Sequence, residues 1–151
     1  MRTRKNFSMN SKSKSKSKSA YKKYTKDKIV SMFLQMLNTV KLYHWKTKSY
    51  SQHIATDTLY SDINSSVDTF VEILLGKTGE RVNLTKQRSL PLVDFNNVDS
   101  FKKEVEKYKD FLIGMSNDSN LSMQRNTDLL NTRDELLGHL NKFSYLLTFD
   151  K

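Results

Sequence analysis

Apolar residues recur at helical spacing along most of this chain, and the pattern predicts four amphipathic helices. We expect these helices at residues 25–48, 53–75, 99–114 and 123–147. No segment shows the two-residue alternation of a half-buried strand, so the predicted fold is all-α. The residues expected to form the apolar faces are Val30, Phe33, Leu34, Leu37, Val40, Leu59, Ile63, Val67, Phe70, Ile73, Leu74, Phe101, Val105, Tyr108, Leu112, Leu129, Leu130, Leu136, Leu137, Leu140, Phe143 and Leu147.

The predicted helices are joined by two short links and one long connection. Residues 49–52 and 116–122 are short and polar, whereas residues 77–97 contain Gly, Pro and paired Asn and form a long crossover. Gly76 is the expected end of the second helix, and Asp99 is the expected N-cap of the third. Four helices with a long crossover between the second and the third predict a four-helix bundle.

The charge of the chain is concentrated near its N-terminus. The 151 residues include 26 Lys and Arg against 16 Asp and Glu, for a formal net charge of +10. Residues 1–28 contain eleven Lys and Arg and a single acid, Asp27, so this segment carries the whole excess. Ser and Lys alternate strictly over residues 11–19, and such a segment has no apolar surface to offset the entropy of ordering. We therefore expect a disordered tail over residues 1–24 and a bundle domain over residues 25–151.

The basic tail is suited to bind nucleic acid through phosphates, with release of counterions. A disordered arm holds no side chain in a fixed position to read base edges, so we expect non-specific DNA binding. The alternatives are RNA as the partner, a solubilising tail, and a localisation signal read by a transport receptor. The residues expected to contact nucleic acid are Arg2, Arg4, Lys5, Lys12, Lys14, Lys16, Lys18, Lys22 and Lys23.

The composition excludes several classes of protein. Cysteine is absent, which excludes a disulfide scaffold, a thiolate zinc site and a cysteine nucleophile. No apolar run approaches the roughly 18 residues that span a bilayer, and the N-terminus carries no apolar signal segment. We therefore expect a soluble, intracellular protein without a membrane partner.

One histidine of the first helix and a polar stripe on the second form the main candidate site. His44 projects within ~40° of the apolar face of its helix. A solvated face of an amphipathic helix explains the stripe without any function. The stripe also contains two pairs at i,i+4 spacing, and each pair can direct two ligand atoms at one metal ion. The stripe consists of His53, Asp57, Asn64, Asp68 and Glu72.

The two pairs cannot serve one metal ion within one chain. Asp57 and Asp68 are eleven residues apart in the sequence, or ~16 Å along a helix. Two antiparallel copies of the helix related by a twofold axis solve this problem. His53 and Asp57 of one subunit, joined by His44, then face the second pair of the other subunit, and the twofold generates two equal sites. The second pair is Asp68 and Glu72, and mixed imidazole and carboxylate ligands without thiolate suit iron, zinc or manganese.

The stretch YHWKTKSYSQHIATDTLYSDINSSVDTFVEILLG resembles the Dps-like mini-ferritins of the ferritin-like superfamily. The family signature is a His-Trp near the end of the first helix, then a second His, and then an acid four residues later with Leu-Tyr just behind it. An Asp follows eleven residues after that acid, and a Glu four residues after the Asp. The matching residues here are His44, Trp45, His53, Asp57, Leu59, Tyr60, Asp68 and Glu72. Weaker likeness through 88–101 and 126–147 extends the resemblance over nearly all of residues 25–149. The composition is also similar to that of uncharacterised Dps-like proteins of large DNA viruses.

The resemblance implies a ferritin-like four-helix bundle that forms a dimer at minimum and a hollow twelve-subunit shell. It implies that Fe(II) is oxidised between two subunits by hydrogen peroxide or oxygen and stored as ferric iron, with DNA bound by the tail. His44, His53 and Asp57 of one subunit and Asp68 and Glu72 of the other would be the catalytic metal ligands. Trp45 and Tyr60 would lie near the site.

Two departures from the family pattern bear on the site. The link KTKSYSQ between the two histidines is shorter than is usual in the family, and Ile73 stands where an Arg often follows the ligand Glu. A non-enzymatic nucleic-acid-packaging protein, with a structural or degenerate metal site on an oligomeric bundle, is therefore the alternative function. A third interpretation is an interaction bundle with a localisation tail. His139 is expected at the surface or core edge of its helix, without a metal.

Overall fold

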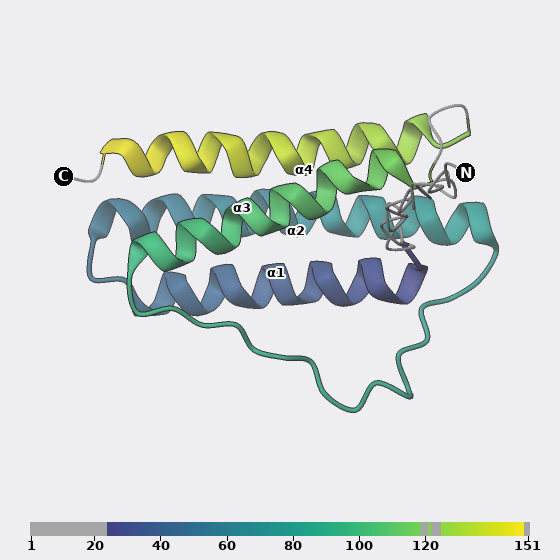
Figure 1. Cartoon of the computed structure of the whole chain (residues 1–151), viewed down its shortest axis with the longest axis horizontal. Helices are drawn as coiled ribbons and strands as arrows, with labels where there is room; N and C mark the ends of the chain where they lie inside the picture. The colour runs from purple at the N-terminus through teal and green to yellow at the C-terminus, as the bar shows by residue number, and fades with distance from the viewer. Residues whose placement is uncertain (1–23, 119–120, 122–124, 150–151) are drawn as a thin grey trace, which may run out of the picture.

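The computed structural model describes residues 24–118, 121 and 125–149, and residues 1–23, which hold nearly all of the expected tail, lie outside this range. The described residues form four α-helices and no strand, which confirms the predicted all-α class. The helices are α1 (Lys26–Lys46), α2 (Tyr50–Thr78), α3 (Val98–Gly114) and α4 (Thr127–Leu146) (Figure 1).

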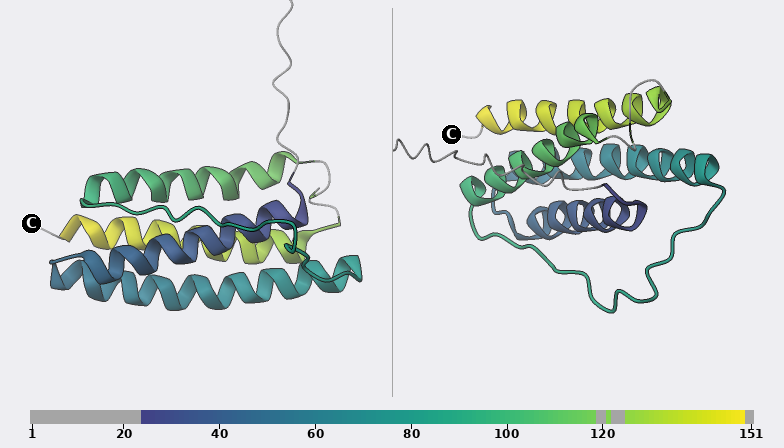
Figure 2. Two further views of the ribbon diagram at one scale, coloured as in Figure 1. Left: turned by 90° about the horizontal axis from the view of Figure 1, so that it is seen from below. Right: turned by 45° about the vertical axis from the view of Figure 1, so that its right-hand side comes forward.

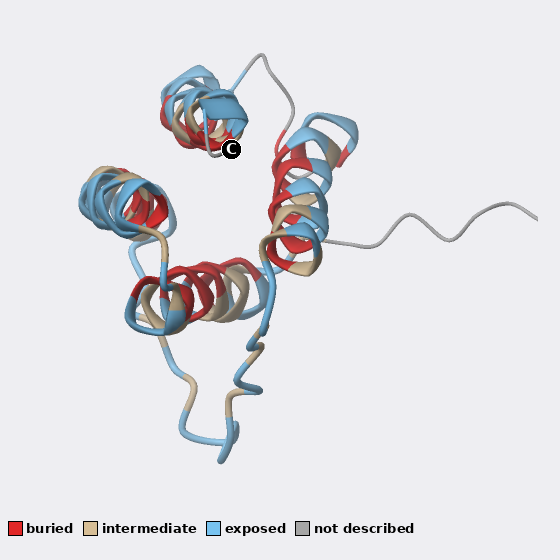
Figure 3. Cartoon of the chain, turned by 90° about the vertical axis from the view of Figure 1, so that its left-hand side faces the viewer, coloured by how far each residue is buried: buried red, intermediate tan, exposed pale blue. Residues whose placement is uncertain are grey.

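The four helices pack side by side around an apolar core. α2 contacts both α1 and α4, and α4 contacts α3. The buried faces of all four helices turn inward in the end-on view of Figure 3. Phe33 meets Phe70 edge to face at 5.2 Å between ring centroids, and Phe101 meets Phe143 in the same manner at 5.8 Å. Such pairs add to the stabilisation that burial of the rings provides.

The predicted apolar faces are buried with three exceptions. Ile73 and Leu137 are partly buried and pack against the core. Leu34 is 40% exposed, so the prediction that it belongs to the buried face is wrong. It lies seven residues before Lys41 and eleven before Trp45, and this spacing places the three on one stripe of α1. The neighbouring helices of the chain do not cover that stripe at Leu34.

Polar side chains cap three of the helix N-termini. Thr25 accepts a hydrogen bond from the backbone N–H of Lys28, and Ser49 caps α2 in the same way. Asn97 caps α3, because its Oδ1 accepts from the N–H of Ser100 at 2.9 Å. The sequence placed this cap at Asp99, which instead lies in the first turn of the helix.

α2 is longer than the sequence predicted at both of its ends. It begins at Tyr50, so that only residues 47–49 link it to α1. It continues through Gly76 and ends at Gly79, whose φ of 67° lies in the left-handed region that favours glycine. Gly76 is therefore not the helix stop. α4 begins at Thr127, four residues later than expected.

The connection between α2 and α3 runs along the outside of the bundle past α1 (Figure 2). Glu80 forms an ion pair with Lys26 near the start of α1. Gln87 accepts a hydrogen bond from Ser31 at 2.9 Å. At the far end of α1, Asp94 pairs with Lys46, and these contacts hold the connection against the helix.

Tyr24 joins the start of the bundle to the end of α3. Its backbone N–H donates to Asp118 at 2.7 Å and its hydroxyl donates to the carbonyl of Phe111 at 2.9 Å. The bundle contacts thus begin one residue before the expected boundary between tail and domain. Because α1 runs from Lys26 to Lys46, Tyr24 and His44 lie at opposite ends of that helix, with ~27 Å between Lys26 and His44.

We predict that Tyr108 makes stability depend on alkaline pH. Tyr108 is buried and donates to Thr39 at 2.8 Å, and burial raises its pKa from 10.0 to about 12. Between these values the unfolded chain releases the phenol proton while the folded chain keeps it. The free energy of unfolding should therefore fall by up to ~1.4 kcal/mol per pH unit. Urea unfolding of the wild type and of Tyr108→Phe from pH 9 to 11.5 measures the contribution of Tyr108 to the free energy of unfolding. An equally steep decline of that free energy in both proteins would contradict the prediction.

None of the helices in the described ranges is both long and apolar enough to cross a membrane.

Candidate metal-binding site

His44 and His53 meet at the end of the bundle where α1 passes into α2. His44 lies two residues before the end of α1 and is buried, whereas His53 lies in the first turn of α2 and is exposed. Their rings stack with 4.0 Å between centroids and 20° between planes. The shortened link thus keeps the two histidines together, because α2 begins already at Tyr50.

Hydrogen bonds fix the orientation and the tautomer of both rings. Nδ1 of His44 donates to the carbonyl oxygen of His53 at 3.0 Å, and Nδ1 of His53 donates to the carbonyl oxygen of His44 at 3.1 Å. A carbonyl oxygen can only accept, so each Nδ1 must carry a proton. The tautomer that these bonds select has its lone pair on Nε2. Metal-ligating histidines are oriented in this way in many proteins, because a bond at one nitrogen prepares the other to bind.

Thr56 strengthens the arrangement on the buried side. Its hydroxyl donates to the carbonyl oxygen of Gln52 at 2.7 Å. The Oγ1 atom of Thr56 also lies 3.2 Å from Nδ1 of His44 and accepts a hydrogen bond from it. Thr56 is fully buried in the first turns of α2, so the orientation of the buried imidazole is set by the packing of α1 on α2.

Asp57 is the third candidate ligand at this end of α2. Its Oδ1 lies 3.8 Å from Nε2 of His44 and 3.8 Å from the ammonium of Lys41. The carboxylate is 65% exposed, so an ion can reach it from solvent. The structure therefore places His44 beside both Asp57 and His53, two of the residues that the sequence grouped with it in one subunit.

Asp68 and Glu72 do not join this group. Both are exposed on α2, and the eleven residues between Asp57 and Asp68 span ~16 Å of helix. Within the part of the chain that the structure describes, no three His, Asp or Glu side chains are arranged to hold a metal ion. One chain alone therefore presents the candidate ligands as two separate groups along α2, which we call half-sites.

The stacked imidazoles do not converge on one point. The lone pair of a ring nitrogen lies in the plane of its ring, and the two planes are nearly parallel and 4.0 Å apart at their centres. Metal–nitrogen bonds are only ~2.1 Å long. A single ion held by both His44 and His53 would therefore require one of the rings to rotate from this arrangement, and the shared ion stays a prediction.

A surface pocket of about 450 Å³ adjoins the site. It is lined by Asn38, Lys41, Leu42, Trp45, Tyr60 and Leu92. Trp45 and Leu92 are 69% and 68% exposed, so Trp45 does not pack inside its own chain. Tyr60 is half-buried, as expected of a residue beside the site. Exposed large apolar side chains beside polar ones are typical of protein interaction surfaces.

Lys41 is the functional candidate that sequence reasoning missed. Its ammonium lies 4.6 Å from the centre of the Tyr60 ring and 5.9 Å from that of Trp45, in addition to its contact with Asp57. Its spacing in the sequence could have identified it. Lys41 precedes His44 by three residues and therefore lies on the same side of α1.

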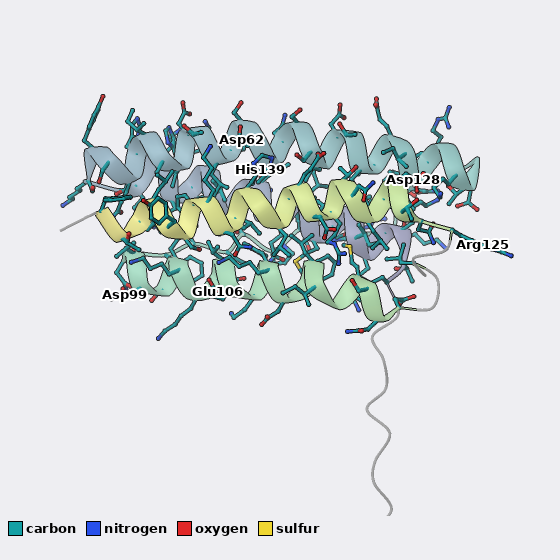
Figure 4. The ribbon with its side chains drawn as sticks, turned by 90° about the horizontal axis from the view of Figure 1, so that it is seen from above. Asp62, Asp99, Glu106, Arg125, Asp128 and His139 are labelled. Atoms are coloured by element: carbon teal, nitrogen blue, oxygen red, sulfur yellow. The ribbon has the colours of Figure 1, made fainter. Side chains whose placement is uncertain are left out.

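His139 occupies the core edge that was expected for it. Its Nδ1 lies 3.5 Å from the carboxylate of Asp62, which joins α4 to α2 (Figure 4). The nine basic residues expected to contact nucleic acid all lie outside the described residues.

Comparison with known proteins gives one match. The family model described as "Family of unknown function (DUF5856)" matches residues 44–147, from His44 to the end of α4. No curated protein and no solved structure matches the chain. The match spans most of the chain and includes all five candidate ligands, and the chain therefore belongs to the DUF5856 family.

Proposed function

We propose that this protein is a Dps-like mini-ferritin with a ferritin-like bundle, which binds Fe(II) between two subunits, oxidises it and stores the ferric product. The observation that carries this proposal is the pair of reciprocal hydrogen bonds between His44 and His53. These bonds orient both rings through Nδ1, so that Nε2 of each ring is the nitrogen available to bind a metal ion, and Nε2 of His44 lies 3.8 Å from the carboxylate of Asp57.

A second copy of the chain supplies what one chain lacks. With two α2 helices antiparallel about a twofold axis, Asp68 and Glu72 of each subunit face the histidines of the other. Three exposed apolar side chains, Leu34, Trp45 and Leu92, are available for burial in such a contact. A dimer therefore completes two equal sites and covers apolar surface at once.

The donor set suits the oxidation of iron. Imidazole and carboxylate ligands without thiolate bind iron, zinc and manganese, and carboxylates stabilise Fe(III) relative to Fe(II). Peroxide accepts two electrons, and two neighbouring Fe(II) ions supply one each. The stacked imidazoles, each addressing its own ion, are compatible with such a pair, because two-metal sites typically place their ions about 4 Å apart.

The aromatic residues have a supporting role in this proposal. Trp45 and Tyr60 border the pocket beside Asp57. In the dimer they shield the site from solvent, and their rings are able to donate an electron to a stray oxidant before it reaches the rest of the chain.

The basic N-terminal segment adds non-specific DNA binding. Its attachment at Tyr24 lies at the end of α1 away from His44, so nucleic acid bound by the segment does not have to approach the metal site. The two activities are therefore separable on one chain, and iron removal protects the DNA that the tail binds.

A nucleic-acid-packaging protein without enzymatic activity is the second candidate. The exposure of Asp57, Asp68 and Glu72 favours it, because a solvated polar stripe needs no metal. The two candidates share the oligomer and the tail, and they differ only in the oxidation of iron.

One experiment distinguishes them. The wild-type protein is loaded with anaerobic Fe(II), peroxide is added, and ferric absorbance is followed while light scattering gives the particle mass. The proposal expects oxidation well above the protein-free rate by a particle of at least two subunits. Oxidation at the protein-free rate by an intact oligomer would favour the packaging protein, and a monomer would contradict both.

A further inference from the structure

The ammonium of Lys41 lies beside a carboxylate oxygen of the candidate site. It is 3.8 Å from Oδ1 of Asp57, the same oxygen that lies 3.8 Å from Nε2 of His44. The ammonium and a metal ion bound by Asp57 are therefore competitors for one carboxylate oxygen. Within the described residues, Lys41 is the one cation paired with a candidate ligand.

The same ammonium already lies over two aromatic rings while it pairs with Asp57. Tyr60 lies 4.6 Å and Trp45 5.9 Å from it, both within the range of a cation–π contact. A lysine that leaves Asp57 can therefore remain beside the rings, with its stem still on α1. The Lys41 side chain is 29% exposed, so its head has room to move.

We infer that Lys41 is an internal counter-cation of the half-site, which pairs with Asp57 in the metal-free protein and must give up this contact, keeping those with the rings of Tyr60 and Trp45, before Asp57 can bind a divalent ion. This inference rests on the proposed function, because it takes His44 and Asp57 as ligands. It assigns Lys41 a role in metal affinity: the lysine weakens divalent-ion binding at Asp57 and stabilises the empty site.

The size of the effect follows from electrostatics. A divalent ion bound to Asp57 lies within about 6 Å of the ammonium unless the lysine withdraws, and the repulsion acts at an exposed position where water screens it. Removal of the charge should therefore tighten binding of a divalent ion about tenfold.

Calorimetric titration with Zn²⁺ tests the inference without any redox step. Zn²⁺ takes the same imidazole and carboxylate ligands and does not change its oxidation state. We expect Lys41→Met to bind Zn²⁺ about tenfold more tightly than the wild type. Lys41→Arg keeps the charge and should bind as the wild type does. Lys28→Met, an exposed lysine of the same helix thirteen residues away, controls for the loss of one positive charge.

The outcomes separate this inference from the proposed function. If the wild type binds Zn²⁺ and Lys41→Met binds within about twofold of it, the inference is overturned and the metal site stands. An equal gain in Lys28→Met would overturn it as well, because the effect would then be that of net charge. If neither the wild type nor Lys41→Met binds Zn²⁺, both the inference and the proposed metal site fail.

Discussion

Replacing Asp68 and Glu72 together by alanine should reduce peroxide-driven oxidation of Fe(II) to the protein-free rate. These carboxylates complete the half-site of the other subunit in the proposed dimer, and without them the ions keep only imidazole and Asp57. Loss of even an indirect partner of a metal ligand costs 10–100-fold in affinity or activity, so loss of two ligands should cost about a hundredfold or more. Ferric absorbance after addition of peroxide to the Fe(II)-loaded protein measures the effect.

The double variant Asp99→Ala, Glu106→Ala is the matched control. Both residues are exposed acids of α3, on the other side of the bundle from α2 (Figure 4). It removes the same two charges and should oxidise iron as the wild type does. The two variants are compared directly. If both oxidise iron equally and well above the protein-free rate, Asp68 and Glu72 are not ligands of the site.

Deletion of residues 1–23 should abolish DNA binding at moderate salt and leave iron oxidation unchanged. Eleven basic residues and one acid occupy residues 1–28, so the deletion removes most of the charge available for phosphate contacts. Tyr24 stays in place to keep its contacts with Phe111 and Asp118. Retardation of DNA in a gel at several salt concentrations measures the effect.

The salt dependence gives this prediction a second test. If the tail binds phosphates, the wild-type affinity should fall steeply with salt, with a slope of up to about −9 in a double-logarithmic plot. Mutation of Lys28, Lys86 and Arg88 on the body should change that slope little. DNA binding by the truncated chain with an unchanged slope would place the interface on the bundle.

The helices were predictable from the sequence because they depend on local periodicity. Spacing alone placed His44 near the buried side of α1, and the structure puts His44 beside Asp57 and stacks it on His53. The eleven residues between Asp57 and Asp68 separate these two carboxylates along α2, and the metal site itself stays a prediction.

The features that the sequence did not reveal depend on contacts between segments. A glycine ends a helix only if the chain must turn there, so Gly76 and Gly79 could not be distinguished before the φ of 67° was known. The stacking of His44 on His53 results from carbonyl acceptors at the junction of two helices, which no spacing rule encodes. The role inferred for Lys41 depends on its contact with Asp57, which only the structure shows.

The central claim is that each metal site is shared between two subunits, and subunit mixing tests it most directly. A variant with His44→Ala and His53→Ala and a variant with Asp68→Ala and Glu72→Ala should each be inactive alone. Unfolded together and refolded in equal amounts, they should form heterodimers in which one of the two sites has all its ligands, so that about a quarter of the wild-type oxidation returns. Oxidation that stays at the protein-free rate in a mixture shown by mass to contain heterodimers would contradict the shared site.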